Sequence, residues 1–115
     1  MYGTVARLRL KRGMESRLQE VLKSHEDAKV PGLVASYTYR LDKSPNEYYM
    51  SAIFENKELY RANANSPEQD ARYRKLAALL EGEPEWHDGE IVHAISGAHA
   101  AEPAKAGRAA AKSQR

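Results

Sequence analysis

The sequence predicts an α+β fold with the element order β-α-β-β-α-β around one four-stranded antiparallel sheet. Three observations support this. The first segment of the chain alternates apolar and polar residues, amphipathic helical segments separate the strands, and a short polar loop joins the two middle strands. The length of 115 residues suits one domain. We therefore expect a single hydrophobic core between the helices and the sheet.

The first strand and helix follow from a change of hydrophobic period. In residues 2–10, apolar Leu8 and Leu10 alternate with arginines, which is the period of a half-buried strand. A helix is predicted over residues 14–28, where apolar side chains recur at spacings of three and four. A Val-Pro-Gly sequence ends it, because proline disfavours helix at the preceding residue. The helical stripe consists of Met14, Leu18, Val21, Leu22 and His25.

A hairpin is predicted after this turn. Strand 33–41 carries Tyr37 and Tyr39 on one side, and strand 47–54 is rich in aromatic and β-branched residues. The polar segment 42–46 between them contains Ser-Pro-Asn, which is typical of a loop. The two strands should therefore pair antiparallel.

The second crossover contains two helix starts. Asn56 is a plausible N-cap for a short helix over residues 57–63. Ser66 and Pro67 have the residue types preferred at the N-cap and first helical position, and the side chain of Gln69 can reach back to the N–H of the cap. The last strand is predicted in residues 84–95, where Asp88-Gly89 either bulges the strand or shortens it.

Right-handed crossovers place both helical layers on the same face of such a sheet. The other face is then uncovered, although the strands carry apolar residues on both sides. Exposed apolar patches usually mark interfaces. We expect two copies of the chain to pack sheet to sheet as a homodimer. Apolar residues available to the two faces include Val5, Val34, Ile53 and Ile91.

Composition excludes several classes of protein. The chain has 18 Lys/Arg and 16 Asp/Glu, but residues 97–115 contain four of the basic residues against Glu102 alone, so residues 1–96 are not basic and nucleic-acid binding is not expected. We predict that residues 1–96 form the domain and that residues 97–115 are a disordered tail. No cysteine is present. Neither a signal peptide nor a membrane helix is predicted, so a cytoplasmic location with no membrane partner is expected.

Four features in order resemble the antibiotic biosynthesis monooxygenase family. They are Val-Pro-Gly before a strand, a tyrosine-rich hairpin that ends in Phe54-Glu55, the segment Tyr60-Arg61-Ala62-Asn63, and Ser66-Pro67 before a helix. The resemblance covers residues 2–95. It implies a dimeric α+β barrel of ferredoxin-like topology. The family includes cofactor-free oxygenases, haem-degrading enzymes, modifiers of small signalling molecules, and proteins of no known reaction.

The resemblance also bears on cofactors. Many relatives have histidines where this chain has Asn63 and Glu68. The haem-degrading branch is similar in fold but uses an asparagine on the first strand and a Trp and His on the third helix. Here the strand offers Thr4 and Arg7, and helix 67–81 has neither Trp nor His. The chain resembles the cofactor-free branch more closely, which implies oxygenation of an aromatic small molecule without cofactor or metal.

Six residues are predicted to form the site. Cofactor-free oxygenation needs a base and hydrogen-bond donors that stabilise the resulting enolate or phenolate. Tyr60 and Asn63 share a helix face, and His25 has a pKa suited to a base. The predicted catalytic residues are His25, Asn63 and Tyr73, and the predicted substrate-binding residues are Tyr60, Trp86 and Tyr37.

Each of these residues also has a structural interpretation. Tyr60 and Tyr73 suit core packing, Asn63 suits a cap or turn, and His25 suits a hydrogen bond to a terminal carbonyl of its helix. Trp86 suits an anchor at the sheet edge or in the dimer seam. The alternative function is therefore a non-catalytic dimer that binds a small ligand or a protein. No metal site is predicted, since the histidines near the last strand match no ligand spacing.

Overall fold

The structure is a computed structural model that describes residues 1–97. Its elements follow the predicted order, with the second crossover divided into two helices. The strands form one antiparallel sheet in the order β2-β3-β1-β4, so the predicted α+β, ferredoxin-like fold is confirmed. The elements are β1 (Tyr2–Arg9), α1 (Glu15–Glu26), β2 (Leu33–Arg40), β3 (Glu47–Phe54), α2 (Lys57–Ala64), α3 (Pro67–Ala77) and β4 (Glu85–Glu90).

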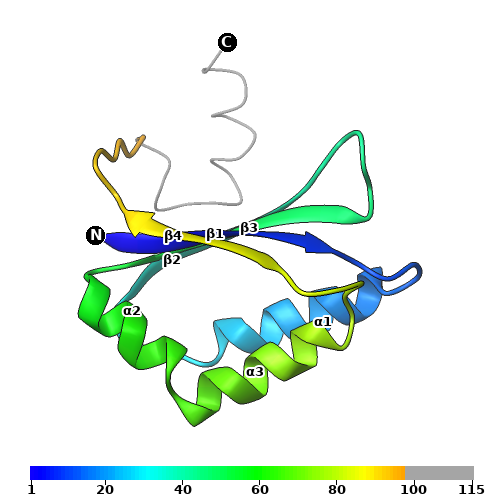
Figure 1. The fold of residues 1–115 in the computed structure, drawn as a ribbon, viewed down its shortest axis with the longest axis horizontal. Helices are drawn as coiled ribbons and strands as arrows, with labels where there is room; N and C mark the ends of the chain where they lie inside the picture. The colour runs from blue at the N-terminus through cyan, green and yellow to red at the C-terminus, as the bar shows by residue number, and fades with distance from the viewer. Residues whose placement is uncertain (98–115) are drawn as a thin grey trace.

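All three helices lie on one face of the sheet (Figure 1). The central strand β1 shows the consequence, because Ala6 and Leu8 are buried toward the helices while Val5 between them is 42% exposed. The core lies where α1 and the end of α3 pack on β1. Its buried members are Ala6, Leu8, Leu10, Leu18, Tyr48, Leu76, Leu79 and Leu80.

We call the other side of the sheet the open face, and no described residue outside the strands covers it as the helices cover the first (Figure 1). The side chains of Tyr37 and Tyr39 are 56% and 58% exposed. Glu47 pairs with Arg7 at 2.9 Å and with Arg9 at 3.5 Å. These pairs tie β1 to β3, although exposed ion pairs add little to stability.

The last strand is shorter than predicted. The prediction ran to residue 95, whereas β4 ends at Glu90. Glu90 pairs with Tyr2, which is the first residue of β1, so β4 has no further strand residue to pair with. Beyond it, the amide of Ile91 donates one hydrogen bond to the carbonyl of Met1. The register through Asp88-Gly89 is unbroken, and the irregularity in the sheet lies instead between Leu33 and Ala35 in β2.

Both helix caps of the second crossover form, with one difference. Asn56 Oδ1 accepts from the amide of Leu59 at 2.8 Å, and Ser66 Oγ accepts from the amide of Gln69 at 3.1 Å. The sequence predicted that the side chain of Gln69 reaches back to the N–H of Ser66, and this hydrogen bond does not form. Gln69 Oε1 accepts a hydrogen bond from Arg72 instead, because the amide of Ser66 already donates to the carbonyl of Asn63.

Within residues 1–97, no helix has the length and hydropathy needed to cross a membrane. The prediction of a disordered tail over residues 97–115 lies, apart from Gly97, outside the described residues.

Gly32 provides a test of how α2 is anchored. Its φ is +80°, and a Cβ added there would lie 2.6 Å from Leu59 Cδ1 of α2. Gly32→Ala should therefore destabilise the protein by about 1–3 kcal/mol, because it adds backbone strain to a steric clash. Gly13 has a similar φ of +81° but open space around it, so Gly13→Ala should cost only about 1 kcal/mol. Urea denaturation measures both, and equal losses would contradict the contact between Gly32 and α2.

Candidate functional site

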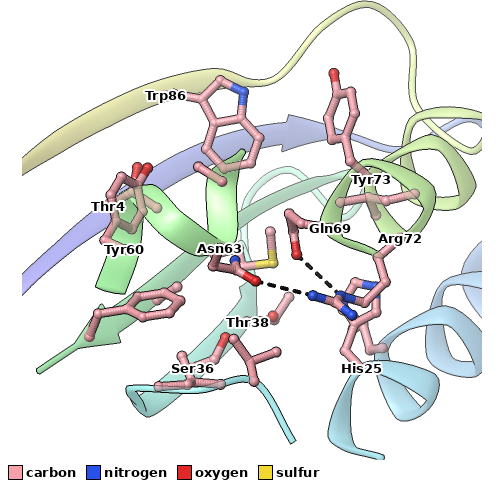
Figure 2. A pocket seen from close by; sticks show the side chains of 18 of the residues that line it. Thr4, His25, Ser36, Thr38, Tyr60, Asn63, Gln69, Arg72, Tyr73 and Trp86 are labelled. Carbon is pink, nitrogen blue, oxygen red and sulfur yellow. Dashed lines mark hydrogen bonds between the residues drawn. The ribbon is translucent and has the colours of Figure 1, made fainter. Parts of the chain in front are cut away.

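A cavity of about 850 Å³ lies between the sheet and the helices. This volume is in the range of small-molecule sites, roughly 300–1,000 Å³. All seven helices and strands of the described chain contribute side chains to its wall (Figure 2). The exposed surface of the wall is mainly apolar.

Five of the six predicted site residues line this cavity, although they come from four different elements. They are His25, Tyr60, Asn63, Tyr73 and Trp86 (Figure 2). Tyr37 does not join them. It pairs with Ser51 and lies on the open face, whereas its neighbours Ser36 and Thr38 line the cavity. Successive side chains of a strand point to opposite faces, so one strand cannot direct Tyr37 and these neighbours to the same side.

Tyr60 donates its hydroxyl hydrogen bond to Asp88 Oδ1 at 2.9 Å. Burial, followed by the hydrogen bond to Asp88, raises the pKa of Tyr60 to about 12. The phenol is therefore protonated at neutral pH and acts as a donor. Its ring also packs against those of Tyr2 and Phe54, with centroids 5.2 and 5.5 Å away, so both interpretations of Tyr60 describe part of its role.

The side chains of Asn63, Gln69 and Arg72 form a hydrogen-bonded group that we call the Arg72 cluster. Arg72 Nη2 donates to Asn63 Oδ1, and Arg72 Nε donates to Gln69 Oε1, both at 3.1 Å (Figure 2). The backbone carbonyl of Asn63 accepts from the amide and hydroxyl of Ser66. Asn63 thus serves the turn with its backbone and faces the cavity with its side chain.

Sequence reasoning missed Arg72 and Gln69 as site residues. A signal was present, because Gln69, Arg72 and Leu76 are spaced three and four apart and so share one face of α3. Leu76 is buried, so two polar residues on its face indicate a polar wall above the core.

His25 lines the cavity from α1, and its Nε2 is buried without a hydrogen-bond partner among the described residues. Burial, followed by the positive charges of Arg72 and Lys75, lowers the pKa of His25. Desolvation and the two cations outweigh the helix dipole, which favours an imidazolium near a helix C-terminus. A neutral imidazole at neutral pH can accept a proton from a ligand.

Tyr73 and Trp86 form an aromatic wall between α3 and the edge strand β4. Their ring centroids are 6.2 Å apart and their planes are inclined by 52°. Trp86 pairs with Ala6 and shares its side of the sheet, and it is 43% exposed. Trp86 lies on the edge strand, which agrees with its predicted position at the sheet edge, and it also lines the cavity.

The described residues contain no group of three His, Asp or Glu side chains placed to hold a metal ion. His87 and Asp88 point to opposite faces of β4. His87 Nε2 lies 3.1 Å from Glu85 Oε1, while Asp88 holds Tyr60.

Comparisons with known proteins establish the fold. No family model and no curated protein matches the chain. Among solved structures, SnoaB, a cofactor-independent oxygenase from Streptomyces nogalater, has a TM-score of 0.72 at 18% identity over 84% of this chain and 97% of its own. A structure named antibiotic biosynthesis monooxygenase has a TM-score of 0.68 at 9% identity over 81% and 100% of the two chains. A Nitrosomonas europaea protein of unknown function has a TM-score of 0.68 at 22% identity over 84% and 94%.

These likenesses confirm at the level of fold what the sequence motifs predicted. The chain has the α+β fold of the antibiotic biosynthesis monooxygenases, and that fold is shared by an oxygenase and by a protein of unknown function. Fold alone does not assign the reaction, so function has to be argued from the cavity.

The lowered pKa of His25 predicts a pH dependence of stability. The folded state binds fewer protons at His25 than the unfolded state, whose pKa is near 6.5. The resulting stability is present above pH 6.5 and is lost as the pH falls through the lowered pKa. His25→Gln should therefore flatten the fall in unfolding free energy below pH 6.5, as measured by urea denaturation across pH. His87→Gln, on the open face, should leave that fall as steep as in the parent.

Proposed function

We propose that the protein is a cofactor-independent oxygenase that acts on an aromatic small molecule in this cavity. The observation that carries the proposal is that five side chains line one space of ligand size: a neutral histidine whose Nε2 has no hydrogen-bond partner among the described residues, an asparagine, two tyrosines and a tryptophan. A structural neighbour named as a cofactor-independent oxygenase supports it.

The proposed mechanism begins with substrate binding against the aromatic wall. Trp86 and Tyr73 offer ring faces and edges to a flat substrate, and the apolar lining excludes water. His25 Nε2 then removes a proton from a phenol or from the methylene carbon of an anthrone. The Asn63 side-chain amide donates to the oxygen on which the negative charge develops.

The substrate anion itself reduces dioxygen. One electron passes to dioxygen, and the two radicals combine with formation of a carbon–oxygen bond to give a peroxide anion. This anion takes back the proton held on His25 and becomes a hydroperoxide. At an anthrone methylene, the hydroperoxide loses its O–O bond and the second methylene proton. One oxygen stays in the product as a ketone and the other leaves as water, so the substrate supplies every electron and no further reductant is consumed.

A second candidate function, non-catalytic ligand binding, is favoured by two observations. Asn63 and Glu68 stand where many relatives have histidines, and the Tyr60 hydroxyl and the Asn63 carbonyl oxygen are already engaged within the chain. Such a protein would use the same cavity without the proton transfer.

Oxygen uptake distinguishes the two candidates. Purified protein incubated with an anthrone should consume dioxygen and form the quinone faster than buffer does. His25→Gln should lower kcat by about 10²–10⁴-fold, the usual contribution of a general base. His87→Gln is the matched control and should keep the parental rate. Anthrone binding without turnover would reject the oxygenase and leave the binding protein.

We further infer that a second copy of the chain covers the open face. Val5 on β1, and Tyr37 and Tyr39 on β2, give this face exposed apolar surface on the two strands that flank β3. The arginines beside them are already paired with Glu47, so their charge opposes close packing less. A twofold axis would bring the same surface of each copy together.

Light scattering after size exclusion tests this assembly. The parent should elute as a dimer at micromolar concentration, and Val5→Glu or Tyr37→Glu should shift it to monomer, because a buried unpaired carboxylate is strongly unfavourable. Ala71→Glu, on the exposed side of α3, should leave the dimer intact. A monomeric parent, or a dimer that survives both open-face substitutions, would contradict the inference.

A further inference from the structure

The cavity wall contains one cation whose charge nothing described in the chain neutralises. Arg72 lies within 4.0 Å of no carboxylate of the described residues, where the ion pairs involve Arg7, Arg9, Arg74 and His87. Its two side-chain partners, Asn63 and Gln69, are neutral amides. Such partners orient a guanidinium and leave its full positive charge in place.

The carboxylates nearest in the wall do not change this. Asp70 lines the cavity but pairs with Arg74 at 3.0 Å, and Asp88 accepts from Tyr60. Glu26 lines the cavity but is exposed and forms no ion pair in the described structure. The lowered pKa of His25, caused in part by Arg72, is consistent with a positive potential inside the cavity.

The hydrogen bonds already made leave one edge of the guanidinium open. Arginine has five N–H bonds, and Arg72 uses the one on Nε and one on Nη2. Both bonds are on the same side of the planar group. The remaining edge, formed by Nη1 and the second hydrogen of Nη2, makes no hydrogen bond with any described residue. Two parallel N–H bonds on one edge match the two oxygens of a carboxylate.

We propose that Arg72 is the receptor for a carboxylate carried by the cavity's ligand, so that the ligand class is an aromatic carboxylic acid. Asn63 and Gln69 hold the guanidinium, its open edge binds the carboxylate, and the ring extends toward Tyr73 and Trp86. The inference rests on the proposed function only in using the same cavity as the ligand site. It requires binding and does not require oxygenation.

Trp86 supplies the measurement, because it is the single tryptophan of the chain and lines the cavity. Its fluorescence can follow titration with 2-naphthoate and with 2-naphthamide, which have nearly the same shape but differ in charge, and with 2-naphthol as a phenol without a carboxylate. The parent should bind 2-naphthoate about tenfold or more tightly than either neutral probe, since charge-assisted bidentate pairs are the stronger hydrogen bonds.

Variants assign the preference to Arg72. Arg72→Gln should abolish the preference for 2-naphthoate while leaving 2-naphthamide affinity near the parental value, which also shows that the cavity is folded. Arg72→Lys should restore part of the preference, because it keeps the charge and loses the two-bond edge. Arg61→Gln is the matched control, since Arg61 is exposed on α2 and does not line the cavity, and it should keep the full preference.

Three results would overturn the proposal. They are equal affinity of the parent for 2-naphthoate and 2-naphthamide, equal loss of 2-naphthoate binding in Arg72→Gln and Arg61→Gln, and no saturable binding of 2-naphthoate at millimolar concentration. A preference for carboxylates without oxygen uptake would leave this inference standing and reject the oxygenase. Oxygen uptake with no carboxylate preference would do the reverse.

Discussion

Side-chain size along the helix-facing side of the sheet determines where the close-packed core ends and the cavity begins. Leu8 on β1 and Leu10 just after it fill the space beneath α1 and the end of α3. Toward the start of the same strand the residues are Ala6 and Thr4, and both Thr4 and the neighbouring Ala52 line the cavity. Close packing extends only as far as the large side chains reach.

Two close contacts at glycines also lie at that end of the sheet. A Cβ on Gly3 would lie 2.4 Å from the carbonyl oxygen of Ala52, so β1 and β3 approach there in a way that only glycine permits. α2 is held over the same end through Leu59, which contacts Gly32. The hollow between α2, α3 and the sheet is therefore built from specific close contacts around its rim.

Some polar groups of the wall satisfy one another by hydrogen bonding, and others do not. Asp88 and Tyr60 satisfy each other, and the high pKa of Tyr60 follows from that contact and from burial. His25 and Arg72 do not satisfy each other, because each favours a neutral or negative neighbour. A folded protein rarely leaves a buried imidazole nitrogen and an unneutralised guanidinium side by side unless something else completes them.

The sequence predicted the fold well because hydrophobic period and cap chemistry are local. The alternation around Leu8, the stripe through Leu18 and the cap at Ser66 needed no knowledge of the rest of the chain. The partners of Gln69 and Arg72 could not be predicted in this way, since they depend on where α2 crosses α3. Their spacing on the buried face of α3 was the only local sign.

Strand parity was the other limit, and it links the two faces of the protein. Ser36 and Thr38 face the cavity while Tyr37 and Tyr39 face outward, and a slip of one residue in β2 would exchange the two sets. The irregularity between Leu33 and Ala35 sets this choice at the start of the strand. The exposed tyrosines proposed for the dimer and the small hydroxyls that leave room in the cavity are thus consequences of one register. A substitution that moved it would damage the open face and the cavity together.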